Sequence, residues 1–490
     1  MISILIVIPI ILPIAAGVVV EFFKPLKTAN KQNAFFACSL ALTFVSIIIA
    51  VVLPDMRLEL FNMADRMPII FVSDDPARLF CILAGSMFLF AGIYACGHLQ
   101  KDKIRRRFYM FFLLTLGMLM GFGFSGNLIT LYLFFEIMTL CSVPLVLHSM
   151  QRNAVAAAFK FLFYAIAGAA LVLVALFVLY ARVPSLEFSA GGVLNSTEIA
   201  GYENQILFVS ILAILGFGAK AGMFPLHGWL PDAHPVAPAP ASAVLSGVIT
   251  KAGVFAVFRF VFYIIGPEII KGTWVQTVWI LLSLFTILMG ALLAYRETVF
   301  KRRIAYSSIS QVNYIMFAMA TLTAIGVTGA LLQIVFHSIL KNALFFTAGS
   351  IIYISGSTDV AGLRGIGKRI PVTMWCFTLL AITAVGVPLT SGFVSKWYIL
   401  SGSLSAEIGV YSWLGPVVLL SSAVLSAGYL LPISVSGLFD EGPGSEIEGQ
   451  EPGLLMLLPI IFLTIACVVF GMFPGSLVSF IEKIASSIVY

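Results

Sequence analysis

Apolar residues follow one another in runs of about 20, the length that carries an α-helix across a bilayer. Short segments rich in charge, glycine or proline separate the runs, and this pattern predicts fourteen membrane spans. Their expected limits are 2–23, 32–53, 78–97, 108–124, 127–148, 155–181, 205–224, 240–265, 273–295, 303–322, 324–354, 371–401, 412–437 and 453–475. Alternating strands are absent from the pattern, so we expect an all-α integral membrane protein and no β-barrel. The first run lacks the basic start of a cleaved signal peptide and is expected to be the first span.

Composition supports a membrane protein. Of 490 residues, 60% are hydrophobic and 10% are charged, whereas a soluble domain has about 25% charged residues. The six cysteines show no metal-ligand spacing and lie within or beside apolar runs, so we expect packing roles, no metal site and no cofactor. They are Cys38, Cys81, Cys96, Cys141, Cys376 and Cys467.

Lysine and arginine distinguish the two sides of the membrane. Loops after odd-numbered spans contain sixteen basic residues, and loops after even-numbered spans, with the C-terminal tail, contain six. The positive-inside bias therefore predicts that the odd loops are cytoplasmic and that both termini lie on the outer side of the cell membrane. Segment 439–453 is cytoplasmic by this count but acidic, and acidic residues have little weight in the bias. The net charge of +6 thus reflects orientation and does not indicate nucleic-acid binding.

Six lysines and arginines lie within the predicted spans, beyond the first residue of each, and one acid lies well inside a span. A charge at membrane depth is costly unless it faces protein or water, so each is a candidate for function. They are the acid Glu136 and the bases Lys160, Lys220, Lys251, Arg259, Lys341 and Lys396. Arg259 lies near a span end, where a side chain that reaches the interface is the better interpretation. Lys160, about a turn and a half into its span, is open to either interpretation and remains an auxiliary candidate.

These residues suit proton transfer. Burial lowers the pKa of a lysine, and a nearby carboxylate raises it again, so a lysine with a movable acid partner can load and release a proton. Glu136 and Lys220 are the natural pair. His337 precedes Lys341 by four residues, which places both on one helix face, and a histidine transfers protons without a large pKa shift.

Two stretches broken by glycine and proline predict discontinuous helices in spans seven and twelve. "AKAGMFPLHGWLPDAHPVAPAPAS" begins with Ala219 and Lys220, and "AVGVPLTSGFVSKW" ends with Lys396 and Trp397. Paired broken helices of this kind indicate an ion site at a repeat interface, since irregular backbone at membrane depth is tolerated only where it is buried or wet. The first stretch also contains His227 and His234, which we keep as auxiliary candidates.

An internal repeat is visible in the sequence. "KFLFYAIAG" (160–168) and "KNALFFTAG" (341–349) align at a separation of 181 residues, and Lys220 and Lys396 are 176 residues apart. We expect two five-helix repeats, spans 4–8 and 9–13, which must be inverted because each has an odd number of spans. The single membrane domain (1–490) would then comprise N-terminal helices (1–107), a first repeat (108–265), a second repeat (273–437) and a C-terminal helix (453–490).

Several motifs resemble those of the antiporter-like proton-channel family. They are the glutamate of span five, "FPLHGWLPDAHPVAPAPASAVLSGVITKAG" (224–253), "AYSSISQVNYI" (305–315) and "HSILKNALFFTAG" (337–349). The family includes the D-type subunit of Mrp Na⁺/H⁺ antiporters, membrane-arm subunits of membrane-bound hydrogenases, and the large antiporter-like subunits of complex I. The resemblance covers residues 70–430 and implies fourteen helices, broken helices seven and twelve, and a row of charges at the midplane.

The resemblance also implies roles for residues that match the motifs. Glu136 corresponds to the helix-five glutamate, Lys220 to the helix-seven lysine and Lys251 to the helix-eight base. His337 and Lys341 match the relay of helix eleven, and Lys396 matches the outlet of helix twelve. Some complex I subunits have glutamate at that outlet and extend into a lateral helix. The lysine and the missing extension make the Mrp antiporter D type or the hydrogenase type more similar, with a complex I type subunit of a quinone-linked dehydrogenase as the alternative.

We therefore expect a proton-translocating subunit of a multisubunit membrane complex, which is not catalytic by itself. Its partners would be lipid and the other membrane subunits of an antiporter or a redox complex, with Na⁺ passing through a neighbouring subunit, because a Na⁺ site needs several oxygen ligands. An independent solute transporter is an alternative, but it would need a pocket of convergent polar groups. A haem subunit would need paired histidines, and His98 and His148 have no evident partners.

Overall fold

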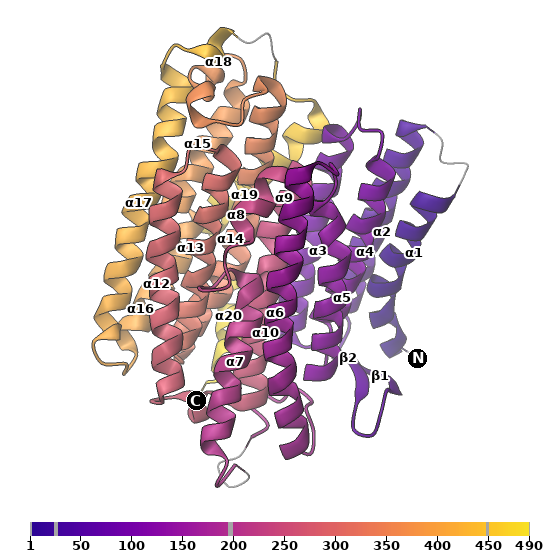
Figure 1. Cartoon of the computed structure of the whole chain (residues 1–490), viewed down its shortest axis with the longest axis vertical. Coiled ribbons are helices and arrows are strands. Elements are labelled where there is room, and N and C mark those ends of the chain that lie inside the picture. Colours follow the sequence, from indigo (N-terminus) through magenta and orange to yellow (C-terminus); the bar gives the residue numbers. More distant parts are fainter. Residues whose placement is uncertain (1, 24–27, 195–198, 447–449, 490) are drawn as a thin grey trace.

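The computed structural model describes residues 2–23, 28–194, 199–446 and 450–489. Its long helices run side by side in one bundle (Figure 1). Lys24 and Lys27 of the first expected basic loop, and positions 447–449 of the acidic segment, lie outside the described residues.

The N-terminal part is η1 (Ile2–Val7), α1 (Ile8–Phe22), α2 (Ala29–Val52), β1 (Arg57–Asn62), β2 (Pro68–Val72) and α3 (Asp75–His98). Next come α4 (Arg105–Gly123), α5 (Leu128–Val146), α6 (Arg152–Arg182), α7 (Glu203–Ala221) and α8 (Leu230–Val236). One continuous helix then combines α9 (Ala239–Val244), the π-helical turn η2 (Leu245–Ile249), α10 (Thr250–Phe260) and a second π-helical turn, η3 (Val261–Ile265).

The later part begins with α11 (Pro267–Ile270), α12 (Trp274–Arg296), α13 (Phe300–Ala320) and α14 (Ala324–Ser355). The 3₁₀ turns η4 (Val360–Leu363) and η5 (Ile366–Lys368) precede α15 (Pro371–Val385), α16 (Ser391–Ser405) and α17 (Tyr411–Phe439). The chain ends with α18 (Pro443–Glu446), α19 (Leu454–Met472) and α20 (Gly475–Ser486).

The structure confirms an all-α multi-pass membrane protein. Among the described residues, eleven helical segments are long and apolar enough to cross a membrane, or twelve if the bent pair Val360–Lys368 and Pro371–Val385 is counted as one span. The other expected spans are occupied by α4 and α13, which begin with clusters of basic residues, and by α15 with α16, which are short individually. The number fourteen stays a prediction.

One element departs from the expected pattern. β1 and β2 form an antiparallel hairpin between the second and third expected spans, where no strand was predicted. Its sequence, "RLELFN", does alternate over a few residues, but the stretch is short. The hairpin lies at the opposite end of the bundle from α18 (Figure 1).

Both broken helices are present, and their breaks occur at glycines. α7 ends at Gly222 (φ +77°) and α15 ends at Gly386 (φ +91°), a left-handed backbone that favours glycine over residues with a Cβ atom. The helix from α9 to η3 is buried along its whole length, and α14 is almost completely buried, whereas α6 and α19 are mostly exposed at the periphery. The two central helices carry Lys251, His337 and Lys341.

Candidate functional site

Lys220 lies in the last turn of α7, directly before the break, and is almost completely buried. Its ammonium donates to the Thr139 hydroxyl and to the Phe135 carbonyl oxygen at 3.5 Å, and it lies 4.2 Å from the centre of the Phe135 ring. Phe135 and Thr139 flank Glu136 on α5, and one carboxylate oxygen of Glu136 is buried without a hydrogen-bond partner. The expected pair therefore occupies neighbouring positions without a direct ion pair.

Lys251 follows the π-helical turn η2 and is fully buried. Its ammonium donates to the carbonyl oxygen of Ser246 at 2.5 Å, five residues earlier in the same helix. π-helical turns inside α-helices are rare and frequently occur at functional sites. The Ser246 hydroxyl in turn lies 2.7 Å from the hydroxyl of Ser308 on α13. Lys251 is thus connected through one serine to the neighbouring helix.

Lys341 is fully buried in α14 and contacts the same helix α13. Its ammonium donates to the Ser307 hydroxyl at 2.7 Å and to the Ile304 carbonyl oxygen at 3.3 Å. Since Ser307 and Ser308 are adjacent, polar groups extend from Lys251 through Ser246 and the two serines to Lys341. The structure therefore brings the predicted residues of spans eight and eleven to one polar cluster.

His337 lies one turn before Lys341 and is buried, with both ring nitrogens lacking a hydrogen-bond partner in the described chain. It shares with Lys396 a cavity of about 10 Å³, also lined by Gln311 and Gln333. That volume is about what one water molecule needs. Gln333 donates to Gln311 at 3.1 Å and accepts from the Ser395 hydroxyl at 2.6 Å. Polar side chains, together with Phe336, Leu340, Ala384 and Gly392, thus line the space between His337 and Lys396.

Lys396 lies on α16, just after the second break. Its ammonium donates to the carbonyl oxygens of Ala384 and Val385 at 2.6 and 2.7 Å. These are the last carbonyls of α15, which have no partner within their own helix, and the negative end of the helix dipole favours a cation there. Lys396 therefore provides hydrogen bonds, across the break, to the carbonyl groups that are unpaired at the end of α15.

The three auxiliary candidates differ in their surroundings. Lys160 on α6 is half-exposed and forms an ion pair of 2.6 Å with Asp232 on α8. His227 is half-buried, with one ring nitrogen unpartnered. His234 is fully buried, has both ring nitrogens unpartnered in the described chain, and stacks on Phe345 at 4.8 Å.

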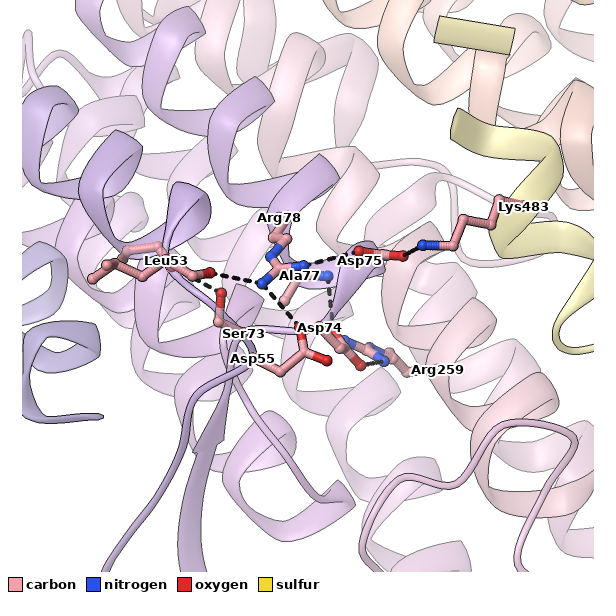
Figure 2. A network of polar contacts seen from close by, with 10 residues as sticks. Leu53, Asp55, Ser73, Asp74, Asp75, Ala77, Arg78, Arg259 and Lys483 are labelled. Atoms are coloured by element: carbon pink, nitrogen blue, oxygen red, sulfur yellow. Dashed lines mark hydrogen bonds and ion pairs between the residues drawn. The ribbon is translucent and has the colours of Figure 1, made fainter. Parts of the chain in front are cut away.

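Arg259 corrects one sequence interpretation. Its side chain is 0% exposed and does not reach water, because the guanidinium binds Asp74 at the start of α3 through two hydrogen bonds of 2.5 and 2.7 Å (Figure 2). The Tyr263 and Phe188 rings lie 4.7 and 5.1 Å from the guanidinium carbon. The position of Arg259 near a span end predicted a side chain that reaches the interface. The two aromatic rings instead cover the guanidinium, and the carboxylate of Asp74, which is distant in the sequence, pairs with it.

Several polar neighbours of the row were not predicted from the sequence. They are Thr139, Ser246, Ser307, Ser308, Gln311, Gln333 and Ser395. Burying a hydroxyl in a membrane helix costs little free energy, because the hydroxyl can bond to the backbone of its own helix. A serine or threonine in an apolar run is therefore not conspicuous in the sequence, whereas a charged residue is. Five of them lie in stretches that stand out in the sequence, Ser307, Ser308 and Gln311 in "AYSSISQVNYI", Ser246 in 224–253 and Ser395 in "AVGVPLTSGFVSKW". His148, considered for a haem pair, instead lies 2.8 Å from the Asp102 carboxylate.

Comparison with known proteins supports the family resemblance. A family model described as "NADH:quinone oxidoreductase/Mrp antiporter, TM" matches residues 125–426. The chain is similar to the NADH-quinone oxidoreductase N-type subunit of Desulforudis audaxviator, with 33% identity over 426 residues that cover 83% of each protein. It is also similar to the Na(+)/H(+) antiporter D-type subunit of Alkalihalophilus pseudofirmus, with 27% identity over 476 residues that cover 95% of this chain and 93% of the relative.

A solved structure supports the fold. A chain of the membrane-bound sulfane sulfur reductase, an archaeal respiratory membrane complex, superimposes with a TM-score of 0.85 and 23% identity. The match covers 100% of this chain and 97% of that one. The two sequence relatives described above are each named as a subunit, so this chain is similar to parts of larger assemblies.

Proposed function

The chain belongs to the NADH:quinone oxidoreductase/Mrp antiporter transmembrane family, and from this we propose that it translocates protons as one subunit of a multisubunit membrane complex. Protons would pass along the buried polar residues between the two broken helices. The proposed order is Glu136, Lys220, Lys251, Lys341 with His337, and Lys396.

The observation that carries the proposal is the polar connection between the two central helices. Lys251 contacts Ser246, Ser246 contacts Ser308, and the adjacent Ser307 contacts Lys341, each through an atom at hydrogen-bond distance. A charge buried in a membrane is expensive and therefore marks an ion pathway by default. The Lys251 ammonium bonds to the carbonyl oxygen of Ser246, and between the two lysines lie the hydroxyls of Ser246, Ser308 and Ser307. Hydroxyls both donate and accept, which suits a proton.

A proton is also a better cargo than Na⁺ for this row. Hard cations need several oxygen ligands, and carboxylates are preferred among them. Glu136 is the single acid of the proposed row, whose other members are five nitrogen bases. If the complex exchanges protons for Na⁺, as the name of the Alkalihalophilus relative indicates for that protein, we propose that Na⁺ passes through a neighbouring subunit.

The assembly we propose is of the Mrp or hydrogenase type, in the cell membrane, with two inverted repeats (108–265 and 273–437). This choice rests on the lysine at position 396, where some complex I type subunits have glutamate. A complex I type subunit is the alternative, and the similarity to the Desulforudis N-type subunit favours it. Transport driven by an imposed Na⁺ gradient would indicate the antiporter type. Transport that requires an electron donor would indicate a redox-driven complex.

Ion transport in inverted vesicles that contain the whole complex tests the proposal. We expect Lys220→Ala and Glu136→Ala to abolish proton transport while the complex persists on a native gel. Lys271→Gln, which alters an exposed loop lysine outside the row, is the matched control and should transport normally. Normal transport by assembled Lys220→Ala and Glu136→Ala complexes would refute the proposed path.

A further inference from the structure

Three buried, uncharged side chains form a directed hydrogen-bond chain beside His337. The Ser395 hydroxyl on α16 donates to the side-chain oxygen of Gln333 on α14 at 2.6 Å. The Gln333 side-chain nitrogen donates in turn to the side-chain oxygen of Gln311 on α13 at 3.1 Å. Since an amide accepts through its oxygen and donates through its nitrogen, the serine at the start of the chain sets the orientation of both amides.

The chain ends at the side-chain nitrogen of Gln311. This nitrogen is buried and has no hydrogen-bond partner among the described residues. Gln311 lines the cavity of about 10 Å³ that also borders Gln333, His337 and Lys396. A buried N–H group without an acceptor is unfavourable, so we expect this donor to be directed to an acceptor at the cavity.

The His337 ring offers an acceptor at the same cavity. Lys396 only donates, and the Gln333 oxygen already accepts from Ser395. Both ring nitrogens of His337 are buried without a partner in the described chain, and a neutral imidazole has one acceptor nitrogen. One water molecule, which the cavity volume accommodates, can accept from the Gln311 N–H group and donate to this nitrogen.

The charged groups that face His337 are all cations. The ring interacts electrostatically with Lys251 on α10, Lys341 on α14 and Lys396 on α16, while α13 and α15 contribute only uncharged side chains to the cavity. Each ammonium opposes a positive charge on the ring. The Gln311 N–H group acts in the same direction, since it cannot accept a hydrogen bond from an imidazolium.

We propose that Gln311 is a positioning residue for proton transfer, whose N–H group, oriented by the two other residues of the chain, keeps the His337 ring neutral between transfers. The ring then carries a proton only in passage between Lys341 and Lys396. One ammonium loses the proton that the ring gains, and the ring gives it to the other lysine, so the number of protons is unchanged. This role rests on the proposed function, since it concerns one step of that proton path.

Gln311→Glu tests the donor through proton transport in inverted vesicles that contain the whole complex. The substitution keeps the size of the side chain but replaces the donor with a carboxylate, which stabilises a positive charge on the ring. A ring that retains its proton cannot accept the next one, so we expect transport per assembled complex to fall about tenfold relative to wild type at low pH. The loss should shrink as the pH rises, because the ring then releases its proton.

Gln276→Glu is the matched control. Gln276 is a buried glutamine of α12 whose side chain bonds to the backbone of Gly272 and Ala320 and does not line the cavity. This variant should keep the wild-type dependence of transport on pH. A loss by Gln311→Glu that is the same at every pH would show a structural effect only and would overturn the proposal.

Ser395→Ala tests the start of the chain. Gln333 then loses the donor that orients it, and the Gln311 amide can turn its oxygen toward the cavity. We expect transport to fall about fivefold, the effect of one hydrogen bond. Ser403→Ala is the control on the same helix, because the Ser403 hydroxyl is equally buried but donates to the carbonyl oxygen of Ser412. It should transport normally.

Normal transport by Ser395→Ala would overturn the proposal even if Gln311→Glu failed to assemble. Lys220→Ala and Glu136→Ala leave the cavity unchanged, so they test the proposed function separately. Loss of transport in those two variants, together with wild-type behaviour of Gln311→Glu and Ser395→Ala, would refute the role of Gln311 and leave the proposed function intact.

Discussion

The hydroxyls between the buried lysines can be tested one residue at a time. Ser308→Ala removes one side of the 2.7 Å contact with Ser246 and leaves the lysines unchanged. We expect about 1 kcal/mol of destabilisation, the usual contribution of one hydrogen bond. Proton transport should fall about tenfold or more, since a positioned group that transfers protons contributes at least that much. Transport assays of vesicles and thermal unfolding of the purified complex measure the two effects.

Ser283→Ala is the control for that variant. Both hydroxyls are equally buried and bond to a carbonyl oxygen four residues earlier in their own helix, but only Ser308 also contacts a serine of another helix among the described residues. Ser246→Ala should match Ser308→Ala, and the double variant should be no worse than either single one, because the two residues form one link. Losses that multiply in the double variant would show that the serines act separately.

Burial cost explains which site residues the sequence could predict. Lys220, Lys251 and Lys341 were evident because an ammonium in an apolar run is expensive and needs a reason. Ser307 and Ser308 were not, since buried serines are common and most bond to their own helix, as Ser283 does. The role of Arg259 depends on Asp74, 185 residues away, and no local pattern identifies a partner at that distance.

Among the helices, the break between α15 and α16 fixes the position of Lys396. A Cβ atom on Gly386 would meet the Cδ and Nζ atoms of Lys396 at 2.8 and 3.0 Å, and the backbone there is left-handed. Gly386→Ala should therefore cost about 1–2 kcal/mol through backbone strain and also displace the lysine. We expect reduced stability in thermal unfolding together with loss of proton transport.

Gly356→Ala separates the two effects. Gly356 ends α14 with a similar left-handed backbone (φ +67°), but its Cβ atom would meet nothing within 4 Å. This control should lose comparable stability and keep its transport. If both variants transport equally well, the exact position of the Lys396 ammonium does not matter.

Helices could be predicted where the residues of the helix itself determine its limits. The apolar run of 324–354 coincides with α14 within a residue, and glycine and proline marked both broken helices. The π-helical turn before Lys251 was missed because its sequence, "LSGVI", contains nothing that distinguishes it from α-helix. The hairpin β1–β2 was missed because strands of six and five residues give too little alternation to separate from a loop.

Contacts between distant parts of the chain hold the bundle together, and Arg259 with Asp74 joins α10 to the start of α3 (Figure 2). Asp74→Asn would leave the fully buried guanidinium unpaired, which costs about 3 kcal/mol in comparable pairs. Asparagine is as good a helix N-cap as aspartate, so the cap on α3 is retained and the loss reports the charge. We expect a lower unfolding temperature and less assembled complex on a native gel.

Asp440→Asn is the matched control, because its pair with Arg364 is exposed on both sides. Exposed pairs contribute about 0–1 kcal/mol, so this variant should be close to wild type. Equal stability of Asp74→Asn and Asp440→Asn would mean that water or another acid compensates for Arg259.

Orientation is a property of the whole chain that follows from its charges. Sixteen basic residues on one set of loops against six on the other predict that the loop at 99–104 is cytoplasmic and that the β1–β2 hairpin is on the outer side. Cysteines introduced by Lys103→Cys and Asn62→Cys, at exposed positions of these two segments, test this with a membrane-impermeant maleimide. In intact cells Asn62→Cys should react and Lys103→Cys should not, and in inverted vesicles the order should reverse. The opposite order would reverse the predicted orientation of the chain in the membrane, while every contact within the row would remain as described.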